Sequence, residues 1–370
     1  MKSVFKIILA LFLVSLCFSM SPPAWQEFSQ TIKKEFEISP DGTTSISNKY
    51  GKVDVKTWNN NRVRIEVKIV VNTTSEDLAH SVFQRIGVDF KNAPSRVEAS
   101  TNIEPEKKSW WGWNSGKADY SINYQVYMPP SNRLEVDAKY CDVSVGELNN
   151  GASVNVKYGS FEMDGLKGDA LIELAYGKGK LAKAGDVSAT VSNGTLSIGQ
   201  CRDIALNSKY SVVNLENTGE IRCETRFDTY KVGQAKVIRN LGKYDNLSIK
   251  SASEIYVNSK NTECRFDKVA GVLDANISYG NIYVGEMSKS FSSVDLLGDY
   301  TDISIGLPKG TPYVLDASAN YAGIGYPKMM TVTYEKEQMT SHEVKGYAGS
   351  NNGSLIKARL RYGALKIREE

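Results

Sequence analysis

Three aspartates form the first group whose type and spacing could do chemistry. Asp295, Asp299 and Asp302 lie close together in the chain, and Asp274 precedes them. A pair of carboxylates can cleave a sugar bond, and several carboxylates on one surface could bind calcium. Alternation along a strand would place the same positions in solvent anyway. The sequence favours this second interpretation.

Three tryptophans form a second group, within the segment 104–118. Trp110, Trp111 and Trp113 could stack on sugar rings or bind a partner's surface if they are exposed. They could instead fold back over the protein, because burying large aromatic side chains is favourable. Both interpretations stay open. Together with Asp295, Asp299 and Asp302, these tryptophans are the candidate ligand-binding residues.

The sequence has few residues suited to other catalytic or cofactor chemistry. The chain has two histidines, His80 and His342, far apart in sequence, so a histidine-dependent triad or a histidine-rich metal site is not expected. The phosphate loop, the nucleotide fingerprint and zinc-type spacings are absent from the sequence. We therefore expect a non-enzymatic protein without catalytic residues, metal or cofactor.

The N-terminus is typical of an export signal. Lys2 and Lys6 precede an apolar run over 7–16, and small residues follow at Cys17, Ser19 and Ser21. The run is too short to span a bilayer, and no later stretch reaches that length. Lipid anchoring at Cys17 is disfavoured because Leu16 precedes it. We expect a protein of the periplasm, the outer surface or the medium.

The net charge and the cysteines restrict the kinds of partner and of cross-link that we expect. The formal net charge is +3, and it falls to +1 once Lys2 and Lys6 are removed with the leader, so nucleic acid is not an expected partner. The four later cysteines are Cys141, Cys201, Cys223 and Cys264. They fall in different repeats at mostly apolar positions, which favours buried free thiols over disulfides or metal ligands.

The candidate aspartates and the four cysteines lie in a short repeat of two alternating strands around a corner residue. The steps between successive corners are 18, 18, 17, 17, 17, 17, 17, 18 and 21 residues. A fixed short period of this kind is typical of a stacked repeat. The predicted corner ladder comprises Tyr140, Tyr158, Tyr176, Asn193, Tyr210, Phe227, Tyr244, Asn261, Tyr279 and Tyr300.

Positions counted from the corner form columns, and these columns predict the fold. Six residues before the corner, and three and five after it, nearly every repeat carries an apolar residue. A strand pair repeated without intervening helices can coil so that each strand pairs in parallel with its counterpart one rung later. We therefore expect an all-β, right-handed parallel β-solenoid with about 17-residue rungs. We also expect the corner tyrosines to face inward. An antiparallel sandwich is the alternative, but it does not explain fixed columns.

The expected organisation has four parts. Residues 1–21 form the signal peptide, and 22–132 form an N-terminal cap with a helix over about 75–86, opened by Ser75. Residues 133–308 hold the regular repeats. Residues 309–370 hold irregular C-terminal rungs, with an inserted hairpin over 329–347 and a closing rung around Tyr362. The charged tail, Arg368 to Glu370, is expected to discourage end-to-end stacking.

Short motifs resemble a known family. Asn48-Lys49-Tyr50-Gly51-Lys52-Val53-Asp54-Val55-Lys56-Thr57-Trp58 is similar to the opening of the secreted bacterial "putative adhesin" family, and Lys139-Tyr140, Lys157-Tyr158-Gly159 and Ser278-Tyr279-Gly280 resemble its internal repeats. These β-strand-repeat proteins are otherwise described as a domain of unknown function. The resemblance implies export, a β-solenoid and a surface or adhesive role, and it transfers no catalytic residue.

Two classes of function remain open. The leading prediction is an adhesin-like surface or periplasmic scaffold that binds an unknown protein or glycan through many weak contacts along a rigid face. The alternative is a β-helix that binds or processes carbohydrate. Self-association through an uncapped end is a further possibility.

Overall fold

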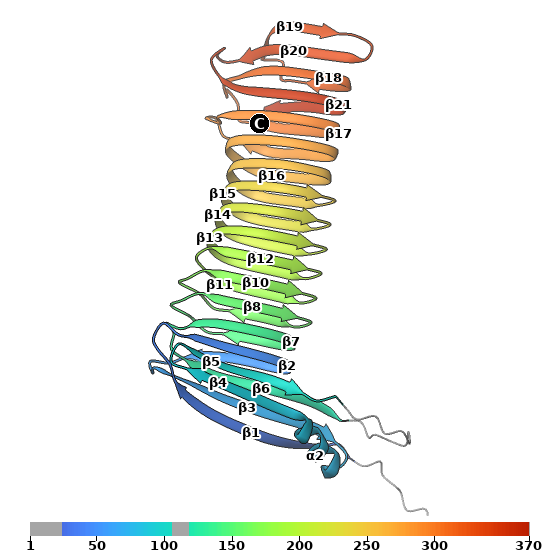
Figure 1. Cartoon of the computed structure of the whole chain (residues 1–370). Coiled ribbons are helices and arrows are strands. Elements are labelled where there is room, and N and C mark those ends of the chain that lie inside the picture. The colour runs from blue at the N-terminus through green and yellow to red at the C-terminus, as the bar shows by residue number, and fades with distance from the viewer. Residues whose placement is uncertain (1–23, 106–117, 370) are drawn as a thin grey trace, which may run out of the picture.

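Over the residues that the structure describes, the protein is a long stack of strands with one helix at its N-terminal end (Figure 1). The computed structural model describes residues 24–105 and 118–369. The signal peptide over 1–21 therefore lies outside the described residues. The prediction of a nearly all-β chain with parallel strand pairing is confirmed.

The N-terminal end is built from antiparallel pairs placed on the first parallel rung. That rung is β2 (Thr43–Thr57), and it pairs in parallel with β5, β6 and β7. The pairs β1–β3, β3–β6 and β4–β5 are antiparallel. The other strands here are β1 (Gln26–Glu37), β3 (Arg62–Thr73), β4 (Ile86–Ala93), β5 (Arg96–Ile103), β6 (Asp119–Met128) and β7 (Arg133–Val145).

The predicted helix is present as α2 (Glu76–Arg85). Ser75 caps it, because the Ser75 hydroxyl accepts a hydrogen bond from the amide of Leu78. Ala79 and Val82 are its buried residues. Together with the β1–β3 and β4–β5 pairs, the helix covers the N-terminal end of the stack, as expected of a cap (Figure 1).

The middle of the stack pairs strand on strand in register. Val187 lies beside Ile204, and Ile204 lies beside Ile221, each one rung further along. The parallel register excludes the antiparallel sandwich for these rungs. The strands are β8 (Ala152–Lys157), β9 (Ser160–Met163), β10 (Ala170–Ala175), β11 (Lys178–Lys183), β12 (Val187–Ser192), β13 (Thr195–Lys209), β14 (Val212–Arg226), β15 (Thr229–Lys243) and β16 (Asn246–Met287).

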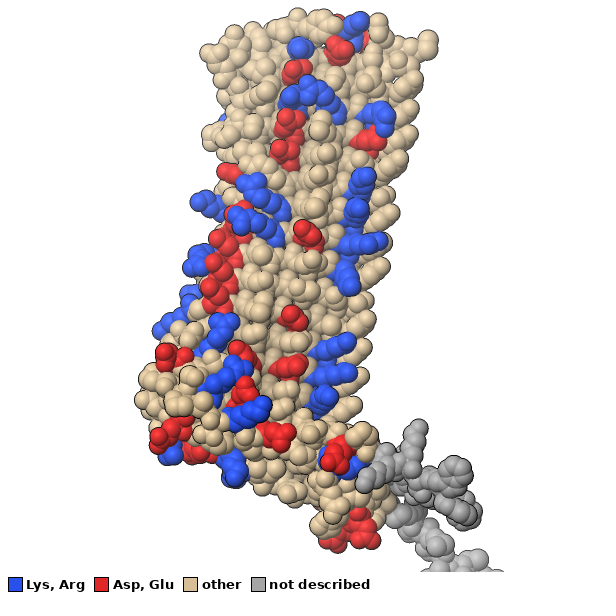
Figure 2. All heavy atoms as spheres, viewed as in Figure 1, with Lys and Arg blue, Asp and Glu red and all other residues tan. Residues whose placement is uncertain are grey.

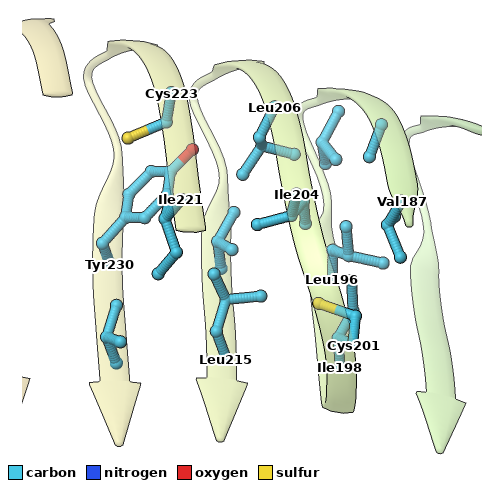
Figure 3. Packing of buried hydrophobic residues seen from close by; sticks show 14 of the residues in the cluster. Val187, Leu196, Ile198, Cys201, Ile204, Leu206, Leu215, Ile221, Cys223 and Tyr230 are labelled. Atoms are coloured by element: carbon cyan, nitrogen blue, oxygen red, sulfur yellow. The ribbon is translucent and has the colours of Figure 1, made fainter. Parts of the chain in front are cut away.

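The predicted apolar columns form the core between the two strand faces. Leu196, Leu215 and Ile221 point inward from adjacent rungs (Figure 3). Tyr230 is also buried, and its hydroxyl lies 2.6 Å from the Ser208 hydroxyl. All four described cysteines are buried and free, as predicted, and burial raises the pKa of the Cys141 thiol to about 11 and that of Cys223 to about 12.

The C-terminal strand does not lie at the end of the stack. The prediction of a closing rung around Tyr362 is therefore wrong about the position of that rung. β21 (Ser354–Glu369) pairs in parallel with β17 (Ser293–Leu307) on one side and with β18 (Tyr313–Gly325) on the other. The last strand in sequence is therefore inserted between two earlier ones. Gly298 makes room for it, because a Cβ there would lie 2.5 Å from a methyl of Leu360.

The far end is covered by the predicted hairpin instead. β20 (Ser341–Ala348) pairs antiparallel with both β18 and β19 (Thr331–Glu337). Every residue of β19 is exposed. Arg368 donates hydrogen bonds to Ser304 and to the carbonyl of Val284. Arg368 and Glu369 thus lie beside β17 inside the stack and not at its end, so the expectation that they discourage end-to-end stacking is wrong.

Candidate functional site

The three candidate aspartates do not converge into one site. Arg361 binds both carboxylate oxygens of Asp299, at 2.8 and 2.9 Å, and holds the pKa of Asp299 below its usual range. Lys357 lies 4.0 Å from Asp295, and Asp302 is exposed. Both basic partners come from β21, whose insertion beside β17 could not be read from the sequence. No group of three or more His, Cys, Asp or Glu side chains in the described ranges could hold a metal ion.

The remaining candidates contribute no assembled site. Trp110, Trp111 and Trp113 lie outside the described residues. His80 is exposed on α2, whereas His342 on β20 lies 2.9 Å from the carboxylate of Glu335. The two histidines therefore occupy opposite ends of the stack (Figure 1).

The corner ladder is where the sequence expectation about side-chain direction fails. The predicted corners all have φ between 50° and 62°, and Tyr50, Tyr321 and Tyr362 share this conformation. The tyrosines face outward, with Tyr158 at 40% exposure and Tyr210 at 55%. Counting by twos through the corner predicted that the tyrosines point inward. That prediction is wrong because a residue in the left-handed region turns its side chain away from the strand's alternation.

The exposed rings stack on one another along the molecule. Phe227 lies between Tyr210 and Tyr244, with ring centroids 5.0 and 4.6 Å apart and nearly parallel planes. Asn193 and Asn261 interrupt the ladder. It therefore consists of three segments, a lower, a middle and an upper one. The lower segment is Tyr50, Tyr140, Tyr158 and Tyr176; the middle is Tyr210, Phe227 and Tyr244; the upper, in stacking order, is Tyr279, Tyr300, Tyr362 and Tyr321.

A column of cations runs beside the middle ladder segment, at the position before each corner. We call Lys209, Arg226, Lys243 and Lys260 the cation stripe. The register pairs Lys209 with Arg226, Arg226 with Lys243, and Lys243 with Lys260. All four are exposed. A second, shorter column pairs Lys49 with Lys139 and Lys139 with Lys157. Figure 2 shows basic residues in two such columns on this face, one above the other.

Within the described ranges, the stripe cations form no salt bridge. Arg226 lies over the Phe227 ring at 5.5 Å, and in the shorter column Lys139 and Lys157 lie over Tyr140 and Tyr158. The nearest columns in these rungs carry two acids, Glu224 and Glu263. The exposed charge along the stripe is therefore positive although the whole chain is close to neutral.

A shallow hollow adjoins the stripe on the same strand face. Its lining includes Asn207, Glu224, Leu241 and Asn258, which occupy the next outward column over the same rungs. The stripe and the hollow therefore form one continuous surface. Sequence reasoning missed this surface because it weighed total charge. The signal was visible as a basic residue before the corner in eight repeats, counting Arg361 before Tyr362.

Two buried carboxylates lie on the inner side of the same corners. Asp228 accepts hydrogen bonds from the Ser208 hydroxyl at 2.7 Å and from the Ser211 amide at 2.7 Å. Asp245 accepts from the Thr225 hydroxyl at 2.6 Å and from the Asp228 amide at 2.9 Å. Burial raises the pKa of both carboxyls. These groups tie one rung to the next and are closed to solvent.

Solved structures similar to this chain include bacterial proteins described as putative adhesins or as a putative cell adhesion protein. No protein-family model matches this chain, and no curated protein matches it. A "putative cell adhesion protein" from Clostridium sporogenes is 10% identical, with 93% of this chain and 100% of that chain covered and a TM-score of 0.18. A "putative adhesin" from Bacteroides fragilis is 11% identical, with 92% and 97% covered and a TM-score of 0.22. One from Parabacteroides merdae is 13% identical, with 75% and 96% covered and a TM-score of 0.24.

Proposed function

We propose that this protein is a non-enzymatic, exported, adhesin-like binding or scaffold protein, built as a right-handed β-solenoid with about 17-residue rungs. The observation that carries the proposal is the unbroken parallel register, which repeats outward columns over a long, rigid face. Repetition of one weak contact along such a face raises overall affinity without any single deep pocket. Its place of action would be the periplasm, the cell surface or the medium.

The alternative, a carbohydrate-binding or polysaccharide-processing protein, is favoured in its binding form by one surface. The hollow beside the cation stripe presents amide side chains at Asn207 and Asn258, which can hydrogen bond to sugar hydroxyls. The processing form has less support. Asp299 is engaged by Arg361, and Asp295 lies near Lys357, so neither is poised as a free acid or base.

Export is tested by expressing the complete chain in a bacterial host and fractionating the cells. We expect the protein outside the cytosol, with a new N-terminus after Ser19 or Ser21. Added protease should then degrade it on intact or osmotically shocked cells. A chain that stays in the cytosol with Met1 in place would refute the proposal. No helix among the described residues has the length and apolar character of a membrane span.

A further inference from the structure

The cation stripe has an electrostatic cost that folding alone does not explain. Like charges opposite one another on neighbouring strands are destabilising, yet the register places four cations side by side. Elsewhere the chain pairs such residues with acids across rungs. Lys180 binds Glu162 at 2.7 Å, and Arg361 binds Asp299. An external anion would remove the repulsion within the stripe.

The spacing of the stripe limits the shape of that anion. Successive strands in a sheet lie about 4.8 Å apart, so the four cations form a straight row with this repeat. A linear polymer with one negative charge per similar length could lie along the row with every charge matched. The shorter column of Lys49, Lys139 and Lys157 continues the same line beyond two uncharged rungs, at Ala175 and Ser192.

The ring ladder argues against nucleic acid as the polymer. Proteins that hold single strands stack bases on exposed aromatic faces. In the middle segment both faces of Phe227 are covered by its neighbours, at 5.0 and 4.6 Å. The ring edges and the hydroxyls of Tyr210 and Tyr244 are what the ladder presents, and neither hydroxyl has a hydrogen-bond partner in the described part of the chain. The middle segment therefore offers hydrogen bonds to a polar polymer, and its central ring has no open face on which a base could stack.

The adjoining hollow adds contacts suited to sugars. Asn207 and Asn258 can donate and accept hydrogen bonds, and Leu241 is 55% exposed between them in the same column. Amides beside an apolar patch fit the hydroxyls and C–H face of a sugar ring. The surface thus combines a row of cations for carboxylates with neighbouring groups for the sugar itself.

We propose that the cation stripe and its hollow bind a linear carboxylated polysaccharide, a polyuronate, laid along the long axis with one sugar per rung. This assignment rests on the proposed binding function and names its ligand class. A chain of four sugars covers the stripe. A chain of about nine sugars, at the strand spacing, reaches the shorter column as well. Affinity therefore rises with oligomer length between these limits, because the second column adds contacts within the same complex.

The test uses the secreted mature chain and fluorescently labelled polygalacturonate, with dextran as the neutral polymer. The stripe variant is K209Q/R226Q/K243Q/K260Q. The matched control is K231Q/K236Q/K250Q/K268Q, which removes the same charge from exposed lysines outside the stripe. We expect polygalacturonate to bind and dextran not to bind. The stripe variant should bind roughly tenfold or more weakly at low salt, and the control should stay within about twofold of wild type.

Folding is checked by thermal melting. The stripe variant should melt at or above the wild-type temperature, because its substitutions relieve repulsion. Absence of polygalacturonate binding, or an equal loss in both variants, would overturn the proposal. Tighter binding of single-stranded DNA or inorganic polyphosphate would overturn the sugar assignment. An exported protein that binds no polyuronate rejects this inference alone, whereas a cytosolic chain rejects the proposed function whatever it binds in vitro.

Discussion

The middle and upper segments of the ring ladder share one corner but differ in what flanks it. Phe227 and Tyr300 both have positive φ and both lie between two stacked rings. Beside Phe227 stands a row of cations without acid partners among the described residues, whereas beside Tyr300 the same column holds the Asp299–Arg361 pair. The corner is therefore structural in both segments, and the flanking column is free to carry function in one of them.

The largest expected effect separates the two segments physically. Deleting residues 354–370 removes β21 and leaves β17 and β18 without the partner between them. Because stacked repeats are stabilised mainly by their nearest neighbours, we expect β18 and the hairpin to lose protection while the middle rungs stay folded. Hydrogen exchange followed by mass spectrometry resolves the two regions. Equal loss of protection in β14 and β15 would show that the stack unfolds as one unit.

The corner comparison is sharpened by matched substitutions. F227N and Y300N both keep a residue that tolerates positive φ, and each removes a ring with two stacking neighbours. Each ring pair contributes about 0.5–1.5 kcal/mol, so we expect both variants to lose about 1–3 kcal/mol of local stability, measured by hydrogen exchange. Polygalacturonate binding should change little in either. A large binding loss in F227N alone would mean that the ring itself contacts the ligand.

The stability of the middle and of the upper segment should also respond to pH with opposite sign. Burial raises the pKa of Asp228 and Asp245 in the folded state. Their contribution to stability is therefore fully present below the unfolded aspartate pKa of about 3.9 and is lost as the pH rises through the raised folded pKa. The pKa of Asp299 is lowered by Arg361, so its contribution is present above the unfolded pKa and is lost as the pH falls through the lowered one.

Local stability at several pH values checks this contrast, once exchange rates are corrected for intrinsic pH dependence. From pH 7 toward mild acid, the rungs of Asp228 and Asp245 should gain stability. The β17–β21 contact should lose stability only at lower pH. D228N/D245N should flatten the response of the middle rungs and leave β17 unchanged. The same acid response in both regions would contradict the assignment of these carboxyls.

The smallest effect belongs to the exposed ion pair itself. R361A removes the partner of Asp299, and exposed ion pairs contribute little to folding. We expect an almost unchanged melting temperature together with a rise in the pKa of Asp299 toward its ordinary value, measured by NMR titration. A clear drop in melting temperature would instead indicate that Arg361 packs the inserted strand.

The sequence predicted the repeating parts of the fold because one column rule applies in every rung. The apolar columns, the buried cysteines, the helix opened by Ser75 and the late hairpin all follow from local pattern. The place of β21 did not follow. A rung-like segment matches any neighbour of the same pattern, so Tyr362 could be recognised as a corner but not placed between Tyr300 and Tyr321.

The site was harder to predict than the fold for two physical reasons. A single positive-φ residue reverses the direction that alternation predicts, so the ladder of Tyr210 and Tyr244 was expected inside the protein. Net charge sums over the whole chain, so a local row such as Lys209 to Lys260 disappears into a total near zero. Three of the candidate residues, Trp110, Trp111 and Trp113, lie outside the described part of the structure and stay predictions.

Whether the cation stripe binds a polyuronate is tested by the salt dependence of polygalacturonate binding, compared between wild type and K209Q/R226Q/K243Q/K260Q. Each matched charge releases counterions, so the logarithm of affinity falls with the logarithm of salt in proportion to the number of contacts, roughly 0.7 per contact for a single-stranded polyanion. We expect a slope for wild type that is steeper by about two to three than that of the stripe variant. Equal slopes for the two proteins would contradict this expectation.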